Sequence, residues 1–130
     1  MNRWILGART RTLPAAITPV IVGAAIAYPK FNLLNALLSL IVGLSLQIAV
    51  NYANDYSDGV RGTDSERVGP TRLVASGLAT AAEVKRAAYI AFGIAAIAGI
   101  YLSIRTSLVL LAIGALAIIS AWRYTGGDNP

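Results

Sequence analysis

The stretch Gln47–Arg72, QIAVNYANDYSDGVRGTDSERVGPTR, joins the two kinds of sequence from which this chain is built. Residues 33–46 before it are mostly apolar, and within it asparagines, aspartates and arginines arrive almost together. Polar groups at membrane depth are costly unless they face a bundle interior or a water-filled cavity. The stretch therefore predicts a hydrophobic span that ends in an inward-facing polar site.

The composition indicates a membrane protein. Of the 130 residues 56% are hydrophobic and 13% are charged, whereas soluble domains carry about 25% charged residues. This length predicts a single domain. The net charge of +5 is spread between long apolar runs, which argues against a nucleic-acid partner. Because the chain has no cysteine and no histidine, disulfides and the usual zinc or haem ligands are excluded, and any metal must be hard and oxygen-bound.

Apolar runs predict an all-α, multipass transmembrane helical bundle. Four runs approach the ~20 residues that cross a bilayer. They lie near Leu13–Tyr28, Leu33–Ala53, Ala87–Ile104 and Ser107–Trp122. The first and last are short, and we expect the first to begin as an interfacial segment. A polar loop is expected from Tyr56 to about Thr80, and Thr80-Ala-Ala-Glu83 predicts a capping box that opens the third helix.

The basic residues predict the orientation. Nine precede the first span, lie between the second and third spans or follow the fourth: Arg3, Arg9, Arg11, Arg61, Arg67, Arg72, Lys85, Arg86 and Arg123. Two, Lys30 and Arg105, fall on the other side. Cytoplasmic loops are enriched in lysine and arginine. We therefore expect both termini and residues 55–86 to be cytoplasmic.

Four polar residues form one stripe at the end of the second span. Asn51, Asn54, Asp55 and Asp58 are spaced i, i+3, i+4 and i+7, which is one face of a helix, and Gln47 extends it one turn deeper. Two carboxylates at the negative, C-terminal end of a helix dipole are unfavourable. Positive charge should compensate them, from the loop arginines 61, 67 and 72 or from a bound divalent cation.

The residue types in this stripe suit one kind of ligand. Mg²⁺ takes one or two carboxylates, keeps several waters and completes its coordination with phosphate oxygens, and arginine binds phosphate bidentately. The pattern thus predicts a membrane site for Mg²⁺ and a phosphorylated, lipidic substrate. The alternative is that these are solvated loop residues just outside the membrane, with no such role.

Three motifs carry a resemblance to a known family. NYANDYSDGVRGTDSERVGPTRLV (51–74) resembles the first aspartate-rich motif of the UbiA superfamily of intramembrane prenyltransferases, most closely its menaquinone branch, the 1,4-dihydroxy-2-naphthoate polyprenyltransferases. ARTRTLPAAITPVIVGAA (8–25) and RYTGG (123–127) are similar to that branch as well. The resemblance covers essentially the whole chain. It implies that residues 1–130 form the N-terminal part of a single nine-helix prenyltransferase domain.

The resemblance also implies roles for individual residues. Asp55 and Asp58 would hold Mg²⁺ against the diphosphate of a polyprenyl donor. Asn54 and Asn51 would orient the metal site and the substrate, with Asn54 also a metal ligand. Arg67 and Arg72 match basic positions near the diphosphate, and Asp64 matches a later acidic position of the menaquinone branch. Implied as catalytic are Asp55, Asp58 and Arg72. One departure is Gly62, where the general family pattern has an aspartate, and this departure favours the menaquinone branch.

The implied reaction is prenyl transfer to an aromatic acceptor. Polyprenyl diphosphate would ionise and 1,4-dihydroxy-2-naphthoate would attack the allylic cation, giving demethylmenaquinone. Alternatives are a different aromatic acceptor, or a non-catalytic four-helix membrane protein. A CDP-alcohol phosphotransferase motif fails after Asp58-Gly59. Because the family's second aspartate motif is not found in the chain, we expect these 130 residues alone to be inactive, with instability, self-association or residual diphosphate binding as the outcome.

Overall fold

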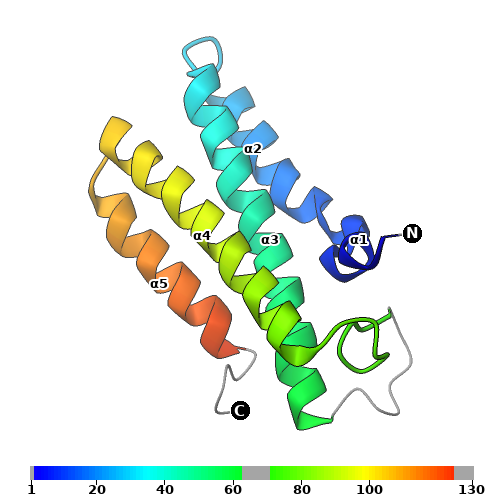
Figure 1. Cartoon of the computed structure of the whole chain (residues 1–130). Coiled ribbons are helices and arrows are strands. Elements are labelled where there is room, and N and C mark those ends of the chain that lie inside the picture. The colour runs from blue at the N-terminus through cyan, green and yellow to red at the C-terminus, as the bar shows by residue number, and fades with distance from the viewer. Residues whose placement is uncertain (1, 63–70, 125–130) are drawn as a thin grey trace.

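The computed structural model describes residues 2–62 and 71–124, and every regular element in these two ranges is a helix. The elements are α1 (Arg3–Ala8), the short 3₁₀ helix η1 (Thr10–Thr12), α2 (Pro14–Ala27), α3 (Leu33–Arg61), α4 (Ala81–Arg105) and α5 (Val109–Tyr124). α3 lies at the centre, with α1 and α2 on one side and α4 and then α5 on the other (Figure 1). The predicted all-α fold class is confirmed.

The longest helices, α3 and α4, pack most extensively against each other. Their contact is built from small side chains: Ala49 and Ala53 on α3 and Ala88 on α4 are completely buried. Small residues let helix backbones approach closely. Such close packing drives helix association in lipid, because the hydrophobic effect does not favour association there. The pair forms a rigid support for the polar residues on the last turns of α3.

Helices occupy all four regions in which spans were expected. α3 and α4, with 29 and 25 residues, are each long and apolar enough to cross a membrane. The segment Arg3–Thr12 and α2 are bent by 48° and qualify as a third span when taken together. The bend falls at Pro14, the first residue of α2, a position that proline favours. α5 is apolar but shorter, with 16 residues.

The second helix is longer than expected. α3 continues past Ala53 to Arg61 and ends at Gly62, whose left-handed backbone (φ 72°) closes the helix, as glycine commonly does. The expectation of a polar loop beginning at Tyr56 was therefore wrong. Hydropathy falls at Ala53, but the helix continues because its polar residues find partners inside the protein. Asp55 and Asp58 accordingly lie on a helix.

The start of α4 shows the predicted capping box. The Thr80 hydroxyl accepts a hydrogen bond from the Glu83 N–H at 3.2 Å, and the Glu83 carboxylate accepts one from the Thr80 N–H at 2.9 Å. Just before it, Gly77 has a left-handed backbone (φ 76°). The preceding segment 71–80 thus turns back into α4.

The two ends of the bundle differ in their contents. The α2–α3 turn and the α4–α5 turn lie at one end, and the N-terminal segment and segment 71–80 lie at the other (Figure 1). At the first end the Arg105 guanidinium donates to the Asn35 amide oxygen at 2.9 Å. Lys30 and Arg105 are therefore at the same end, as their assignment to one side of a membrane requires. Which side is cytoplasmic stays a prediction.

Candidate functional site

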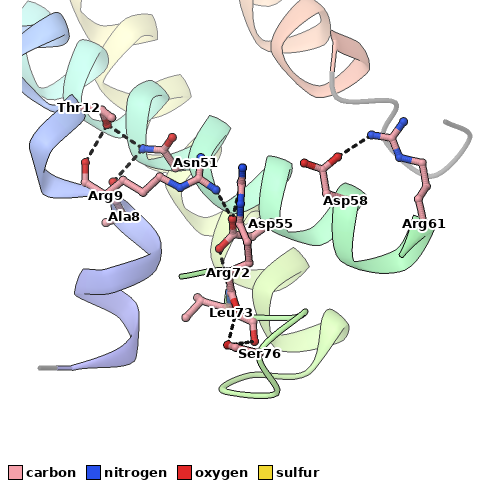
Figure 2. Close-up of polar contacts among 10 residues, drawn as sticks. All are labelled: Ala8, Arg9, Thr12, Asn51, Asp55, Asp58, Arg61, Arg72, Leu73 and Ser76. Atoms are coloured by element: carbon pink, nitrogen blue, oxygen red, sulfur yellow. Dashed lines mark hydrogen bonds and ion pairs between the residues drawn. The ribbon is translucent and has the colours of Figure 1, made fainter. Parts of the chain in front are cut away.

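Asp55 lies at the centre of the polar contacts and is completely buried. Its Oδ1 accepts hydrogen bonds from the guanidinium groups of Arg9 and, at 3.1 Å, of Arg72. Its Oδ2 accepts from the backbone N–H of Leu73 at 3.1 Å. Figure 2 shows these groups converging on one carboxylate from the N-terminal segment and from segment 71–80. Asp55 thus joins three parts of the chain.

Arg9 is a site residue that the sequence did not single out, except as one of nine basic residues. It ends α1 with a left-handed backbone (φ 52°), which is strained for a residue other than glycine. Its side chain is only 13% exposed and forms an ion pair with Asp55. In the part of the chain that the structure describes, the buried Arg9 Nε has no hydrogen-bond partner.

Asn51 fixes the same N-terminal segment one turn away from Asp55. Its side-chain amide donates to the Ala8 carbonyl at 2.8 Å and to the Thr12 hydroxyl at 3.0 Å. The residue is 3% exposed. The prediction that the stripe faces the protein interior is therefore confirmed at Asn51 and at Asp55. The predicted role of Asn51 in orienting a substrate stays a prediction.

Asn54 and Asp58 form a second, less buried row of the stripe. Both residues are half-buried. The Asp58 side chain is 17% exposed and pairs with Arg61, three residues further along α3, at 2.8 Å. Figure 2 shows this pair apart from the Asp55 cluster. The four predicted residues therefore share a helix. Asn51 and Asp55 bond the N-terminal segment, and Asp58 forms its described ion pair with Arg61 on α3 itself.

Segment 71–80 is held tightly against α1 and α3. Leu73 is completely buried, and a Cβ added at Gly7 would lie 2.5 Å from its Cδ1. A Cβ added at Gly59 would lie 2.5 Å from Val74. These close approaches fix the backbone directly after Arg72, whose side chain is 11% exposed. Asp64 and Arg67, also predicted as site residues, lie outside the described residues.

The loop arginines 61, 67 and 72 were predicted as one source of the positive charge that compensates the two aspartates. The structure confirms this for Arg61, which pairs with Asp58, and for Arg72, which pairs with Asp55. Arg9 is an additional partner. No local sequence signal marks it, because the contact joins residues 46 positions apart and depends on how α1 packs.

An aromatic cluster lies beside the stripe. The Trp122 ring on α5 stacks on Tyr56 with centroids 5.9 Å apart, and lies 5.2 Å from the Tyr89 ring. The Lys85 ammonium is 5.3 Å from the centre of the Tyr56 ring, within the range of a cation–π interaction. These contacts attach α5 to α3 and α4 at the end of the bundle that carries the polar site.

An apolar cavity of about 340 Å³ lies further along the bundle, and its lining includes no residue of the aromatic cluster. It is lined by residues of α3, α4 and α5, among them Val42, Leu46, Gly99, Ile100, Leu111 and Ile118. Such a space between helices can accommodate part of an apolar chain.

The site offers limited support for a metal. Within residues 2–62 and 71–124, no three acidic side chains come together to hold an ion. The oxygens of Asp58 and Asn54 have the chemistry that Mg²⁺ prefers, and this ion needs only one or two carboxylates. Asp55 fits less well, because both of its oxygens already accept hydrogen bonds, two of them from guanidinium groups.

Comparisons with known proteins agree with the motifs. Residues 16–128 match the UbiA prenyltransferase family. The chain is 50% identical over 130 residues to a Mycobacterium tuberculosis protein named 1,4-dihydroxy-2-naphthoate octaprenyltransferase, and 39% identical over 136 residues to the Escherichia coli protein of that name. Each alignment covers 98% of this chain and 44% of the relative.

A third relative with the same name, from Bacillus subtilis, is 34% identical over 125 residues, which are 94% of this chain and 40% of that protein. The chain thus spans less than half the length of these relatives. No solved structure matches it. The family match covers most of the chain, including the stripe on α3 and segment 71–80, and the chain therefore belongs to the UbiA prenyltransferase family.

Proposed function

We propose that the protein containing this chain transfers a polyprenyl group from polyprenyl diphosphate to 1,4-dihydroxy-2-naphthoate, giving demethylmenaquinone for menaquinone biosynthesis. The observation that carries this proposal is the 50% identity, over nearly the whole chain, to a relative named for that acceptor. The long motif of residues 51–74, which resembles that of the menaquinone branch, also supports it.

The site residues would act mainly by charge. Arg72, and by its place in the motif Arg67, would bind the diphosphate through bidentate, charge-assisted hydrogen bonds. Asp58 and Asn54 would hold Mg²⁺, with Asp64 contributing by its place in the motif. When bound, Mg²⁺ supplies positive charge that stabilises the departing diphosphate. Asn51 holds the N-terminal segment against this site. It would also orient the substrate.

The apolar surroundings would protect the reaction. An allylic cation reacts with water, so it must form where water is excluded. The cavity between α3, α4 and α5 is lined almost entirely by apolar side chains and would accept part of the prenyl tail. The aromatic ring of the acceptor would approach from the end of the bundle that carries Asp58.

The lipid bilayer is part of the proposal. We propose a multipass protein of the cell membrane, with residues 55–86 and both ends of the stretch 1–130 on the cytoplasmic side, where a water-soluble diphosphate product can leave. Residues 1–130 would be the N-terminal part of one prenyltransferase domain. The length of the relatives, of which these residues cover 44%, supports this placement.

The test uses the natural protein in which this chain occurs, in lipid nanodiscs with Mg²⁺ and labelled polyprenyl diphosphate. 1,4-Dihydroxy-2-naphthoate and a set of other aromatic acids are offered as acceptors, and products are identified by mass. We expect demethylmenaquinone, its loss in Asp58→Asn, and its retention in Lys30→Gln, a control at the opposite end of the bundle. Prenylation of another acceptor alone would favour a different UbiA-type enzyme. No prenylation with retained folding would favour a non-catalytic membrane protein.

A further inference from the structure

We propose that the groove between α2 and α3, at the end of the bundle opposite Asp58, binds an anionic phospholipid. Its phosphate would lie at Lys30 and Arg105 and one of its acyl chains along α2. These two residues are the exceptions in the charge distribution, since the other nine basic residues belong to the opposite side. Basic residues are depleted on the non-cytoplasmic side of membrane proteins, and an anionic ligand gives a physical reason for these two. The inference does not depend on the proposed function.

The groove changes character along its length. It has a volume of about 480 Å³. Lys30, Asn32 and Asn35 line it near the α2–α3 turn, and along α2 its lining runs from Ala27 to Pro19, about 12 Å at the rise of an α-helix. The α2 side of this lining is entirely apolar. A phospholipid has the same order of chemistry, with a polar headgroup at the interface and chains in the hydrocarbon core.

The polar side chains at this end of the groove present hydrogen-bond donors. The Asn32 amide oxygen accepts from the Asn35 N–H at 3.0 Å, and the Asn35 amide oxygen accepts from Arg105 Nε at 2.9 Å. The amide NH₂ groups, the Lys30 ammonium and the other two guanidinium nitrogens of Arg105 can only donate. Neither Lys30 nor Arg105 forms an ion pair with any residue that the structure describes. Such a group of donors suits the oxygens of a phosphate.

The distribution of acidic residues makes this end complementary to an anion. Of the acidic residues, the structure describes Asp55, Asp58 and Glu83, which lie on the last turns of α3 and the first turn of α4. Those turns are at the other end of the bundle (Figure 1). Among the described residues, the end with the groove therefore carries two cations and no carboxylate. This charge favours an anionic phospholipid over a zwitterionic one.

Aromatic residues indicate the depth of this end in the membrane. Tyr28 and Phe31, on either side of the Pro29-Lys30 pair, are exposed, and so is Tyr101, one turn before Arg105. The Arg105 guanidinium lies 5.8 Å from the centre of the Tyr101 ring. Tyrosine is enriched where the hydrocarbon core meets water. The two basic side chains therefore lie at the level of lipid phosphates.

The first experiment measures lipid binding to the natural protein in which this chain occurs, by native mass spectrometry in detergent. Phosphatidylglycerol and phosphatidylcholine with identical chains are titrated separately. We expect phosphatidylglycerol to bind more tightly. Lys30→Gln should weaken its binding about fivefold and Lys30→Gln/Arg105→Gln about twenty-fivefold, since each basic residue near an anionic lipid contributes ~1 kcal/mol. Arg86→Gln, an exposed residue near the start of α4, is the matched control and should leave the affinity within about twofold.

The second experiment tests whether an acyl chain lies in the groove. A Cβ added at Gly23 or at Gly93 meets nothing within 4 Å, so both positions have room for a larger side chain. Gly23 lines the groove, and Gly93, on α4, is not among the lining residues. Gly23→Leu should weaken phosphatidylglycerol binding at least about fourfold, the contribution of one buried methylene group. Gly93→Leu should leave it unchanged.

A soluble anion is distinguished from a lipid by adding glycerol phosphate, which has the headgroup chemistry without the chains. It should not displace phosphatidylglycerol at an equal concentration, and displacement would indicate a site for a soluble anion instead. Equal affinity for the two lipids would overturn the proposal. So would wild-type affinity in Lys30→Gln/Arg105→Gln or in Gly23→Leu, each with an unchanged Tm. None of these measurements uses the prenyl-transfer assay, so a failure of the proposed function leaves them unaffected.

Discussion

At the scale of single residues, two glycines determine how segment 71–80 packs. Gly7 faces Leu73 and Gly59 faces Val74, and at both positions a Cβ would come within 2.5 Å of the neighbouring side chain. Since Leu73 and Val74 directly follow Arg72 in the chain, these glycines control where the guanidinium of Arg72 lies relative to Asp55. The absence of a side chain at these two glycines thus contributes to the geometry of the charged site.

Gly59→Ala is therefore expected to destabilise the protein by ~1–3 kcal/mol, the usual cost of an extra methyl group in a packed contact. Val74→Ala in the same protein should recover part of the loss by making room. The matched control is Gly23→Ala in α2, where a Cβ meets nothing within 4 Å and alanine favours the helix. Thermal unfolding in detergent distinguishes the three variants, and equal Tm values for Gly59→Ala and Gly23→Ala would contradict this packing.

Arg72→Lys should also be harmful although it keeps the charge. The Arg72 guanidinium reaches Asp55, and in the proposed function it would bind the diphosphate as well, which a planar fork can do and an ammonium cannot. Loss of one charge-assisted hydrogen bond costs ~1.5–3 kcal/mol, so the rate of prenyl transfer should fall at least about tenfold. Arg86→Lys, on α4, should leave the rate unchanged. A normal rate in Arg72→Lys would exclude a bidentate role.

The sequence predicted part of this site and could not predict the rest. The spacing of Asn51 and Asp55 placed them on one inward face, and the charge of the helix end required a cation near Asp55, which Arg72 provides. The spacing did not show that Asn54 and Asp58 would be less buried than the other two. It also gave no sign of Arg9, since its contact with Asp55 arises only when α1 folds back beside α3.

At the scale of elements, the end of α3 shows that a helix can continue beyond its apolar run. The apolar run ends near Ala53, and the boundary of the span was predicted there, yet the helix continues to Arg61. The polar turns are stable because the N-terminal segment covers them: Asn51 bonds the Ala8 carbonyl and Tyr52 bonds the Trp4 carbonyl at 2.7 Å. Sequence signals that act locally were more successful, as at the start of α4.

The capping box at the start of α4 gives a prediction for this element. Thr80→Ala removes the acceptor for the Glu83 N–H and should cost ~1 kcal/mol, whereas Thr80→Ser keeps the hydroxyl and should cost little. The effect is local, so hydrogen exchange should accelerate at the first amides of α4 in the alanine variant. Unchanged exchange at residues 81–84 would show that the cap does not hold this helix end.

At the scale of the whole molecule, the distribution of charge predicts the orientation in the membrane. The turns that contain Lys30 and follow Arg105 share one end of the bundle (Figure 1), and the N-terminal arginines and segment 71–80 share the other. Because the chain has no cysteine, single cysteines report on each end without background. Lys30→Cys and Ser76→Cys should react with an impermeant thiol reagent from opposite sides of a sealed vesicle, with Ser76→Cys reacting from the cytoplasmic side. Reaction of both from one side would refute this topology.

The last prediction is that the polypeptide of residues 1–130, expressed alone, forms no demethylmenaquinone. A diphosphate leaving group carries several negative charges and needs stabilisation from more than one side, whereas the described residues supply charge from the end of α3 and its immediate neighbours. Much of α5 is also uncovered, including Ile113, Leu116 and Ile119, and we do not expect these helices alone to enclose a prenyl chain and an aromatic acceptor away from water. Such a polypeptide should associate with itself and retain some binding of diphosphate. Reconstitution with Mg²⁺, polyprenyl diphosphate and 1,4-dihydroxy-2-naphthoate tests this, and steady product formation would mean that association between copies supplies the charges and the enclosure that one copy lacks.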